Sequence, residues 1–244
     1  MEENLNDANA QQKEIDLSKQ ETLPPEKKWN TLYKNYIDDN FKNWDEYFQT
    51  KMKLKRNFFK MIIKYLNTNK PILECGSGTG KFSAYLATLG FNVYAIDLEQ
   101  EMVEQTKAIC NHYSPNNPIH AIQCSAFDLP FEDKFFSVTH SSGVMEHYSD
   151  EEIVQLINEQ LRVSNTCIFS VPTKYFEKKM LGNERFLSKK EWRKIIEKSN
   201  AKIIEKTGYH YKTLRNRIKD VLIKPKRLFK PIALFVFVLK EKEK

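Results

Sequence analysis

The sequence predicts an α/β domain: a doubly wound, mostly parallel, seven-stranded sheet with helices on both faces and a helical cap before it. Short apolar runs alternate with segments of helical periodicity from residue 71 to residue 239, which is typical of a parallel sheet with crossover helices. A glycine-rich loop follows the first apolar run, and a segment rich in Trp, Tyr and Phe precedes it. Together these features place a ligand site at the end of the first strand.

The 244 residues divide into three parts by composition. Residues 1–28 are polar and poor in aromatic side chains, so we expect a disordered tail. Residues 29–68 carry aromatic side chains at mostly helical spacings, so we expect two or three helices that form an N-terminal cap. Residues 69–244 form the α/β domain. Hydrophobic residues make up 41% of the chain, which is enough for one substantial core.

The individual elements follow from periodicity and from residues that begin or end helices. Gly90 ends the first helix of the domain, and Ser188 is suited to cap the last one. A basic segment with helical character, 212–222, lies between the last two strands. Strands are predicted over residues 71–75, 91–97, 119–124, 134–141, 165–172, 201–208 and 231–239, and helices over residues 80–90, 99–113, 150–162 and 188–199.

Polar or glycine-rich segments follow or end four of these strands. Ligands of parallel sheets bind at the carboxyl ends of the strands, near the point where the strand order reverses. The glycine loop, Asp97, residues 125–127 and residues 140–143 are therefore expected to share one rim of the sheet.

The glycine loop reads ILECGSGTGKF over residues 72–82. A phosphate-binding P-loop requires glycine at position 75 and Ser or Thr at position 82, and the chain has Cys75 and Phe82 there. A dinucleotide fingerprint requires glycine at position 81, where the chain has Lys81. The acidic Glu74 near the end of the strand would repel a pyrophosphate, and it suits a ligand that offers an ammonium or hydroxyl groups.

With Glu74 the loop forms the pattern E-x-G-x-G-x-G, which resembles the class I, Rossmann-like S-adenosylmethionine (SAM)-dependent methyltransferases. Four further segments resemble the second to fifth strands of that family and their following loops: VYAIDLEQEMV, AIQCSAFDLPF, FFSVTHSSGVMEHYSD and CIFSVPT. The resemblance covers about residues 70–240. It implies that the cofactor is SAM, that the product is S-adenosylhomocysteine (SAH), and that no metal is used.

The resemblance also implies a cofactor site along the rim. Glu74 would lie near the methionyl ammonium, and Asp97 would accept hydrogen bonds from the ribose hydroxyls. Ser125 stands where the family often has an acid that holds the adenine amino group, so Asp128 is a possible substitute and adenine would rely on backbone and apolar neighbours. The expected cofactor-binding residues are Glu74, Gly76, Ser77, Gly78, Gly80, Asp97, Leu98, Ser125, Ala126, Phe127 and Ser141.

Methyl transfer from a sulfonium is an in-line displacement, which positioning alone accelerates strongly. A base is needed only when the acceptor holds a proton that it cannot easily lose. His140 and His147 are the candidates for a base or a substrate contact, and each can equally be a packed, hydrogen-bonded imidazole. Several aromatic side chains either close the acceptor side of the site or pack in the core: Tyr33, Tyr36, Trp44, Tyr175 and Phe176.

The motifs favour a small-molecule acceptor that is methylated on O or N. The position after the fourth strand reads HSSGV, which does not resemble the Asn/Asp-Pro-Pro-aromatic motif of amino-methylases. The Pro-Cys pair of cytosine C5 enzymes and the clustered acids of metal-dependent catechol-type enzymes are also missing. Three rival functions remain: a methyltransferase that acts on RNA, protein or peptide, a non-catalytic SAM-binding regulatory protein, and a nicotinamide oxidoreductase, which Lys81 disfavours.

The net charge of +7 comes from the C-terminal part, because residues 201–244 hold thirteen Lys or Arg against four Asp or Glu. Such a segment is a solvated face or a surface for an acidic partner, with nucleic acid the less favoured reading. The four cysteines lack metal-ligand spacing and are expected to be buried thiols. No signal peptide or membrane-spanning run is evident, so we expect a cytoplasmic protein, whose oligomeric state stays open.

Overall fold

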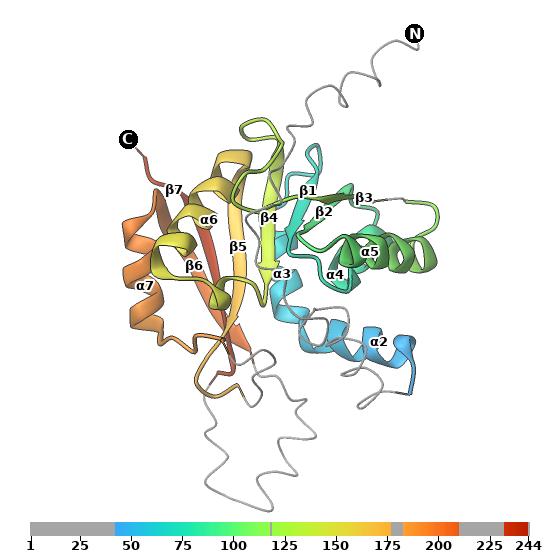
Figure 1. Cartoon of the computed structure of the whole chain (residues 1–244), viewed down its shortest axis with the longest axis horizontal. Helices are drawn as coiled ribbons and strands as arrows, with labels where there is room; N and C mark the ends of the chain where they lie inside the picture. Colours follow the sequence, from blue (N-terminus) through green and yellow to red (C-terminus); the bar gives the residue numbers. More distant parts are fainter. Residues whose placement is uncertain (1–41, 118, 177–182, 210–231, 244) are drawn as a thin grey trace, which may run out of the picture.

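The computed structural model of the chain describes residues 42–117, 119–176, 183–209 and 232–243. Its centre is a seven-stranded sheet with the strand order β3-β2-β1-β4-β5-β7-β6 (Figure 1). The strands are β1 (Ile72–Cys75), β2 (Val93–Asp97), β3 (His120–Gln123), β4 (Phe136–Ser142), β5 (Ser164–Pro172), β6 (Ala201–Tyr209) and β7 (Leu234–Glu241). The first five strands are parallel, and β7 runs antiparallel between β5 and β6. The predicted fold class, a doubly wound and mostly parallel sheet, is confirmed.

Helices cover both faces of the sheet (Figure 1). They are α2 (Trp44–Leu54), α3 (Arg56–Tyr65), α4 (Lys81–Thr88), α5 (Gln100–Tyr113), α6 (Asp150–Val163) and α7 (Lys189–Lys198), with a short 3-10 helix η4 (Met145–His147) after β4. Successive side chains of β5 point to opposite faces of the sheet and so contribute to two separate cores. Ile168 faces the core under α3 and α4, whereas Cys167, Phe169 and Val171 face the core under α6 and α7. Each strand residue therefore meets a helix on whichever side it points.

The N-terminal helices α2 and α3 belong to the first of these cores. Phe58 and Ile62 are fully buried, and both pack with Phe82 of α4 and Val138 of β4. The predicted helical segment before the sheet is thus present over residues 44–65, and much of its aromatic content serves packing. The tail 1–28, Tyr33, Tyr36 and the basic segment 212–222 lie outside the described residues.

Helix starts follow the local sequence. Ser188 caps α7 as predicted, and it forms a capping box in which Glu191 reaches back to the Ser188 backbone N–H. Ser149 and Glu152 form the same arrangement at the start of α6. The prediction that the fourth strand begins at residue 134 is wrong. Lys134 has φ of 56°, a left-handed conformation that a strand cannot contain, and β4 begins at Phe136.

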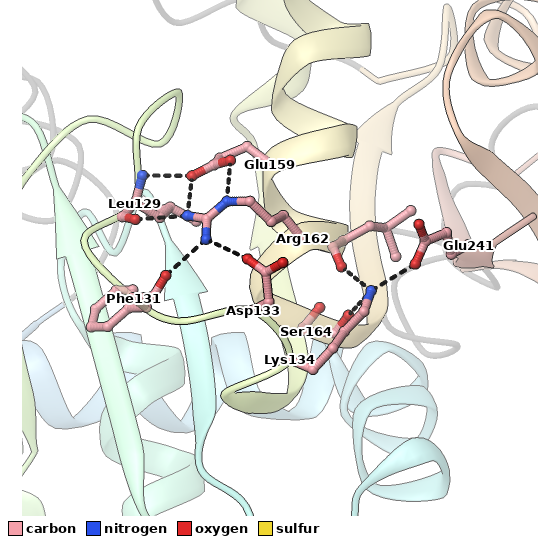
Figure 2. A network of polar contacts seen from close by, with 9 residues as sticks. Leu129, Phe131, Asp133, Lys134, Glu159, Arg162, Ser164 and Glu241 are labelled. Atoms are coloured by element: carbon pink, nitrogen blue, oxygen red, sulfur yellow. Dashed lines mark hydrogen bonds and ion pairs between the residues drawn. The ribbon is translucent and has the colours of Figure 1, made fainter.

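A network of polar contacts fixes the loop between β3 and β4 (Figure 2). Arg162 at the end of α6 donates to the backbone carbonyls of Leu129 and Phe131 at 2.8 Å, and it pairs with Glu159 at 2.7 Å. Glu159 in turn accepts from the Leu129 backbone N–H at 2.7 Å. The loop whose beginning carries residues 125–127 is therefore anchored to α6.

Candidate active site

The site lies where the strand order reverses. β1 pairs in parallel with β2 on one side and with β4 on the other, so the chain segments that leave these strands diverge at their carboxyl ends. The glycine loop leaves β1 at this point, Asp97 ends β2, and the segment 143–147 follows β4. The glycine loop, Asp97 and Gly143 of the predicted rim therefore lie at strand ends here, whereas His140 belongs to the body of β4.

The glycine loop has room for backbone only. Gly76 has φ of 72°, and a Cβ there would lie 2.6 Å from Val144. Gly80 has φ of 69°, and a Cβ there would lie 2.6 Å from the Cα of Thr106 in α5. The Ser77 hydroxyl also contacts the Thr106 hydroxyl at 2.9 Å. A loop held this tightly presents its backbone at the rim in one conformation.

Asp97 ties the end of β2 to this loop. Its Oδ2 accepts a hydrogen bond from the Gly78 backbone N–H at 2.8 Å, and its Oδ1 accepts from the Glu99 backbone N–H at 3.2 Å. Burial raises the pKa of this carboxyl, while the backbone donors act in the opposite direction. Each carboxylate oxygen retains acceptor capacity for a ligand hydroxyl.

Glu74 is buried in β1 and points to the start of α4. Its Oε2 accepts hydrogen bonds from the backbone N–H of Ser83 at 2.9 Å and from the Ser83 hydroxyl at 2.5 Å. Burial raises the pKa of Glu74 to about 7, which these donors and Lys81 partly oppose. In this structure the carboxylate stabilises the N-terminal turn of α4, and its predicted contact with a ligand ammonium stays a prediction.

The loop after β3 places the adenine-side candidates together. The Ser125 hydroxyl accepts from the Phe127 backbone N–H at 3.2 Å, so it already stabilises this turn. Phe127 packs edge to face against Tyr148, and Leu98 is exposed. Asp128 is exposed, whereas Ser125 and Ala126 are half-buried. Residues 125–127 are thus less exposed to solvent than Asp128.

His140 lies inside the sheet rather than at its last residue, because β4 continues to Ser142. The ring is fully buried and lies edge to face against Phe58, with centroids 5.9 Å apart. Neither ring nitrogen has a hydrogen-bond partner among the described residues. Burial lowers the pKa of His140 to about 3, so the imidazole is neutral at neutral pH and a weak base.

His147 ends the 3-10 helix after β4. Its Nδ1 lies 2.8 Å from the Asn183 side-chain oxygen, and burial lowers its pKa. Ser141 is buried, and its hydroxyl has no partner among the residues that the structure describes. A catalytic role of either histidine stays a prediction.

The predicted acceptor-side aromatics are spread apart in the fold. Trp44 begins α2 and packs against Tyr47, with ring centroids 5.5 Å apart. Tyr175 follows β5 and is 45% exposed, which leaves it available at the surface. Phe176 packs against the core under α3 and α4. These three side chains therefore do not form one aromatic wall.

Sequence reasoning missed a group of buried ionisable residues at the same rim. Lys55 joins α2 to α3, and its Nζ donates to the Ser142 hydroxyl at 2.7 Å. Glu146 in η4 is buried, and burial raises its pKa to about 8. Lys55 is one of several basic residues in the stretch KMKLKR (51–56) and gave no signal, because its position over β4 depends on how α3 packs.

The cysteines agree with the expectation of buried thiols. The four cysteines are free and buried, as predicted. Among residues 42–117, 119–176, 183–209 and 232–243, no group of three His, Cys, Asp or Glu side chains is arranged to hold a metal ion. In the same ranges no helix is long and apolar enough to cross a membrane.

Comparison with known proteins relates one segment of the chain to a family and the whole fold to solved structures. Residues 72–166 match the family described as "Methyltransferase domain". The architecture matches magnesium protoporphyrin IX methyltransferase from Synechocystis PCC 6803, solved with bound SAH, with a TM-score of 0.61 and 14% identity over 86% of this chain and 93% of that chain. Residues 72–166 therefore match a methyltransferase domain and the fold is that of a solved methyltransferase, in agreement with the resemblance seen in the sequence.

Curated relatives match over part of their length. The chain is 29% identical to phosphoethanolamine N-methyltransferase 1 of Zea mays over 93 residues, which are 38% of this chain and 18% of the maize protein. It is 28% identical to the uncharacterized methyltransferase YodH of Bacillus subtilis (strain 168) over 137 residues, 52% of this chain and 58% of that protein. The chain therefore spans less than two thirds of either relative.

Proposed function

We propose that this chain is a SAM-dependent methyltransferase that transfers a methyl group to an O or N atom of a small-molecule acceptor. The observation that carries the proposal is the joint placement of Asp97 and the glycine loop at the reversal of strand order. A ligand diol at this point can hydrogen-bond to the Asp97 carboxylate, and a flexible ligand tail can lie along the glycine backbone. SAM offers both groups: the diol of its ribose and its methionyl tail.

The residues present fit this cofactor. Asp97 would hold the ribose hydroxyls, and Gly76 to Gly80 would line the tail, because a Cβ at Gly76 or Gly80 would collide with neighbouring residues. Leu98 and Phe127 would flank adenine, with Ser125 offering one neutral hydrogen bond. Glu74 would attract the methionyl ammonium from behind the loop.

The bound cofactor supplies an electrophilic methyl group on a sulfonium. The chain's own contribution is to orient that methyl toward the acceptor atom and to keep water out. Alignment of reacting groups can contribute about 7 to 11 kcal/mol to such a step. A small-molecule acceptor is further supported by the named maize and Synechocystis relatives, whose names refer to phosphoethanolamine and magnesium protoporphyrin IX.

The test has two stages. Isothermal titration with SAM, SAH and NAD is expected to show binding of the first two only, and binding of NAD alone would favour the oxidoreductase alternative. Methyl transfer from labelled SAM is then measured to phosphoethanolamine and to a panel of hydroxyl, carboxyl and amine compounds. Transfer to a panel member supports the proposal, whereas SAM binding without transfer to any acceptor favours a regulatory SAM-binding protein.

A macromolecular acceptor is the second candidate, and it rests on the basic composition of residues 201–244. Binding to a single-stranded RNA oligonucleotide would then weaken steeply with salt, because phosphate contacts release counterions. Fluorescence anisotropy at two salt concentrations measures this. Absence of RNA binding at low salt would remove the RNA version of this candidate.

A further inference from the structure

Lys55 is buried at the rim of the candidate active site. The residue is 8% exposed and joins α2 to α3. Its Nζ lies 5.9 Å, 5.5 Å and 5.4 Å from the ring centroids of Phe58, Phe82 and Tyr209. Within the described part of the chain its Nζ donates one hydrogen bond, to the hydroxyl of Ser142, the last residue of β4. An ammonium has three donors, so this environment leaves donor capacity unused.

The position of Lys55 has no evident purpose in the architecture alone. It is the N-cap residue of α3, yet its side chain makes no capping hydrogen bond. No carboxylate among the described residues lies within 4.0 Å of its Nζ. An ammonium buried without a charged partner is costly, and proteins normally keep such a group only when something completes it.

The charged groups around Lys55 come from every element packed against it. Lys81 of α4 repels it, whereas Glu146 of η4 and Glu74 of β1 attract it from a distance, and Tyr209 of β6 contributes a ring. Burial, followed by Lys81, lowers the pKa of Lys55 to about 7. An anion brought to this point would raise that pKa again, so its binding would be coupled to proton uptake.

Glu146 is a second buried ionisable residue near Lys55. It is 4% exposed, and its Oε2 is buried without a hydrogen-bond partner in the described part of the chain. Lys55 and Glu146 attract each other electrostatically, and no salt bridge joins them among the described ion pairs. Lys55 and Glu146 are thus two neighbouring buried groups whose hydrogen-bonding capacity is not fully used by the described residues.

We propose that Lys55 binds an acidic group of a ligand, a carboxylate or a phosphate, at the carboxyl end of β4. The two sources of such a group are the methionyl carboxylate of SAM and an acidic group on the methyl acceptor. The inference rests on the proposed function for the identity of the cofactor. In either case Ser142 orients the Lys55 ammonium, and the aromatic rings exclude water from it.

The experiment compares Lys55→Met with Lys51→Met. Methionine fills the space of the lysine stem without a charge. Lys51, in the preceding helix α2, is a control lysine with similar burial, 6% exposed. Thermal unfolding of both variants establishes that each is folded. Binding is measured by isothermal titration of SAH and of methylthioadenosine, which lacks the amino acid tail. Inorganic phosphate and acetate are then titrated into the SAH-saturated proteins.

Loss of a hydrogen bond to a charged group corresponds to about a 10- to 100-fold loss of affinity. If Lys55→Met weakens SAH by that factor and leaves methylthioadenosine unchanged, Lys55 binds the methionyl carboxylate. If SAH is unchanged and binding of phosphate or acetate is lost only in Lys55→Met, Lys55 binds the acidic group of the acceptor.

Two results overturn the inference: equal effects of both variants in every titration, or no effect of Lys55→Met on any probe. A wild-type protein that fails to bind SAH contradicts the proposed function instead. In that case the phosphate and acetate titrations of the unliganded proteins decide the role of Lys55.

Discussion

The Asp97 carboxylate accepts a hydrogen bond from the Gly78 backbone N–H at 2.8 Å, so the end of β2 holds the glycine loop before any ligand is present. The two elements proposed to bind the ribose are thus coupled directly. A ligand diol that binds Asp97 adds to a carboxylate that is already oriented, which reduces the cost of ordering the site.

Asp97→Asn is expected to weaken SAH binding by about 10- to 100-fold, because a neutral amide replaces a charged acceptor of hydroxyl hydrogen bonds. The protein should remain folded, since the amide oxygen can still accept from Gly78. Titration calorimetry measures the affinity. Asp128→Asn, at an exposed position in the neighbouring loop, is the control. Unchanged SAH binding in Asp97→Asn would remove the ribose assignment, and a loss in Asp128→Asn together with no effect of Ser125→Ala would move the adenine contact to Asp128.

Gly80→Ala is expected to destabilise the protein more than Gly90→Ala. Both glycines have positive φ, of 69° and 85°, so both variants carry the backbone strain of about 1 kcal/mol. Only at Gly80 would the new methyl group meet backbone, at 2.6 Å from the Thr106 Cα. Urea unfolding should therefore show an additional loss of about 1 to 3 kcal/mol in Gly80→Ala. Equal losses would mean that the loop can move away from α5 freely.

His140→Phe is expected to make the fold less sensitive to acid. The unfolded chain takes up a proton at His140 near pH 6.5, whereas the folded imidazole has a pKa of about 3, so this residue lowers stability as the pH falls from 6.5 to 3. We compare the free energy of unfolding of the variant with that of the wild type at each pH. The difference in favour of the variant should be roughly 2 to 3 kcal/mol larger at pH 4 than at pH 8. Denaturant unfolding at both pH values checks this, with His120→Phe on the exposed end of β3 as control. The same gain in both variants would contradict the burial argument.

Turnover of the histidine variants addresses a separate question. If His140→Ala and His147→Ala both retain near-normal transfer to an accepted compound, neither imidazole is a required base, and proximity is sufficient.

Lys55→Met should stabilise the unliganded protein at low pH. The pKa of Lys55 is lowered on folding from 10.5 to about 7, so the unfolded chain binds more protons between these values and wild-type stability rises with pH across that window. The cost of the buried ammonium is therefore full below pH 7 and vanishes near pH 10.5. We expect a gain on the order of 3 kcal/mol at pH 6 that shrinks by pH 9.5. A loss of stability at pH 6 would show that the ammonium is well compensated without a ligand.

Arg162→Ala should destabilise the protein by about 2 to 4 kcal/mol, because it leaves two backbone carbonyls and Glu159 without their charged donor. Arg162→Lys should recover only part of this loss, since an ammonium cannot donate in a fixed fork to several acceptors. Thermal unfolding measures both variants. Lys64→Ala removes an exposed ion pair with Glu205 and should cost much less than Arg162→Ala, because solvent screens exposed pairs. An Arg162→Ala loss as small as that of Lys64→Ala would contradict the anchoring role.

The sequence was sufficient to predict the sheet and the glycine loop, because both are local. Apolar periodicity specifies each strand, and the rule for parallel sheets places the loop and Asp97 on one rim. The β4 boundary failed at Lys134, whose left-handed conformation depends on contacts with α6, β5 and Glu241 of β7. Hydrophobic pattern alone contains no information on those distant partners.

The burial of Lys55 and Glu146 could not be predicted from the sequence either. Neither residue stands in an unusual local pattern, and their burial results from the packing of α3 and η4 over the end of β4. His140 shows the reverse case. Its position near the strand end suggested an accessible base, but two further residues of β4 and Phe58 enclose it.

The place of β7 in the sheet also bears on how the chain folds as it is synthesised. β7 lies between β5 and β6, and among the described strands β6 pairs only with β7. Until residues 234–241 leave the ribosome, the open hydrogen-bonding edge of β5 is exposed and β6 has no partner to join. An exposed strand edge is a template for wrong pairing, so β5 is protected on this side only once β7 is in place.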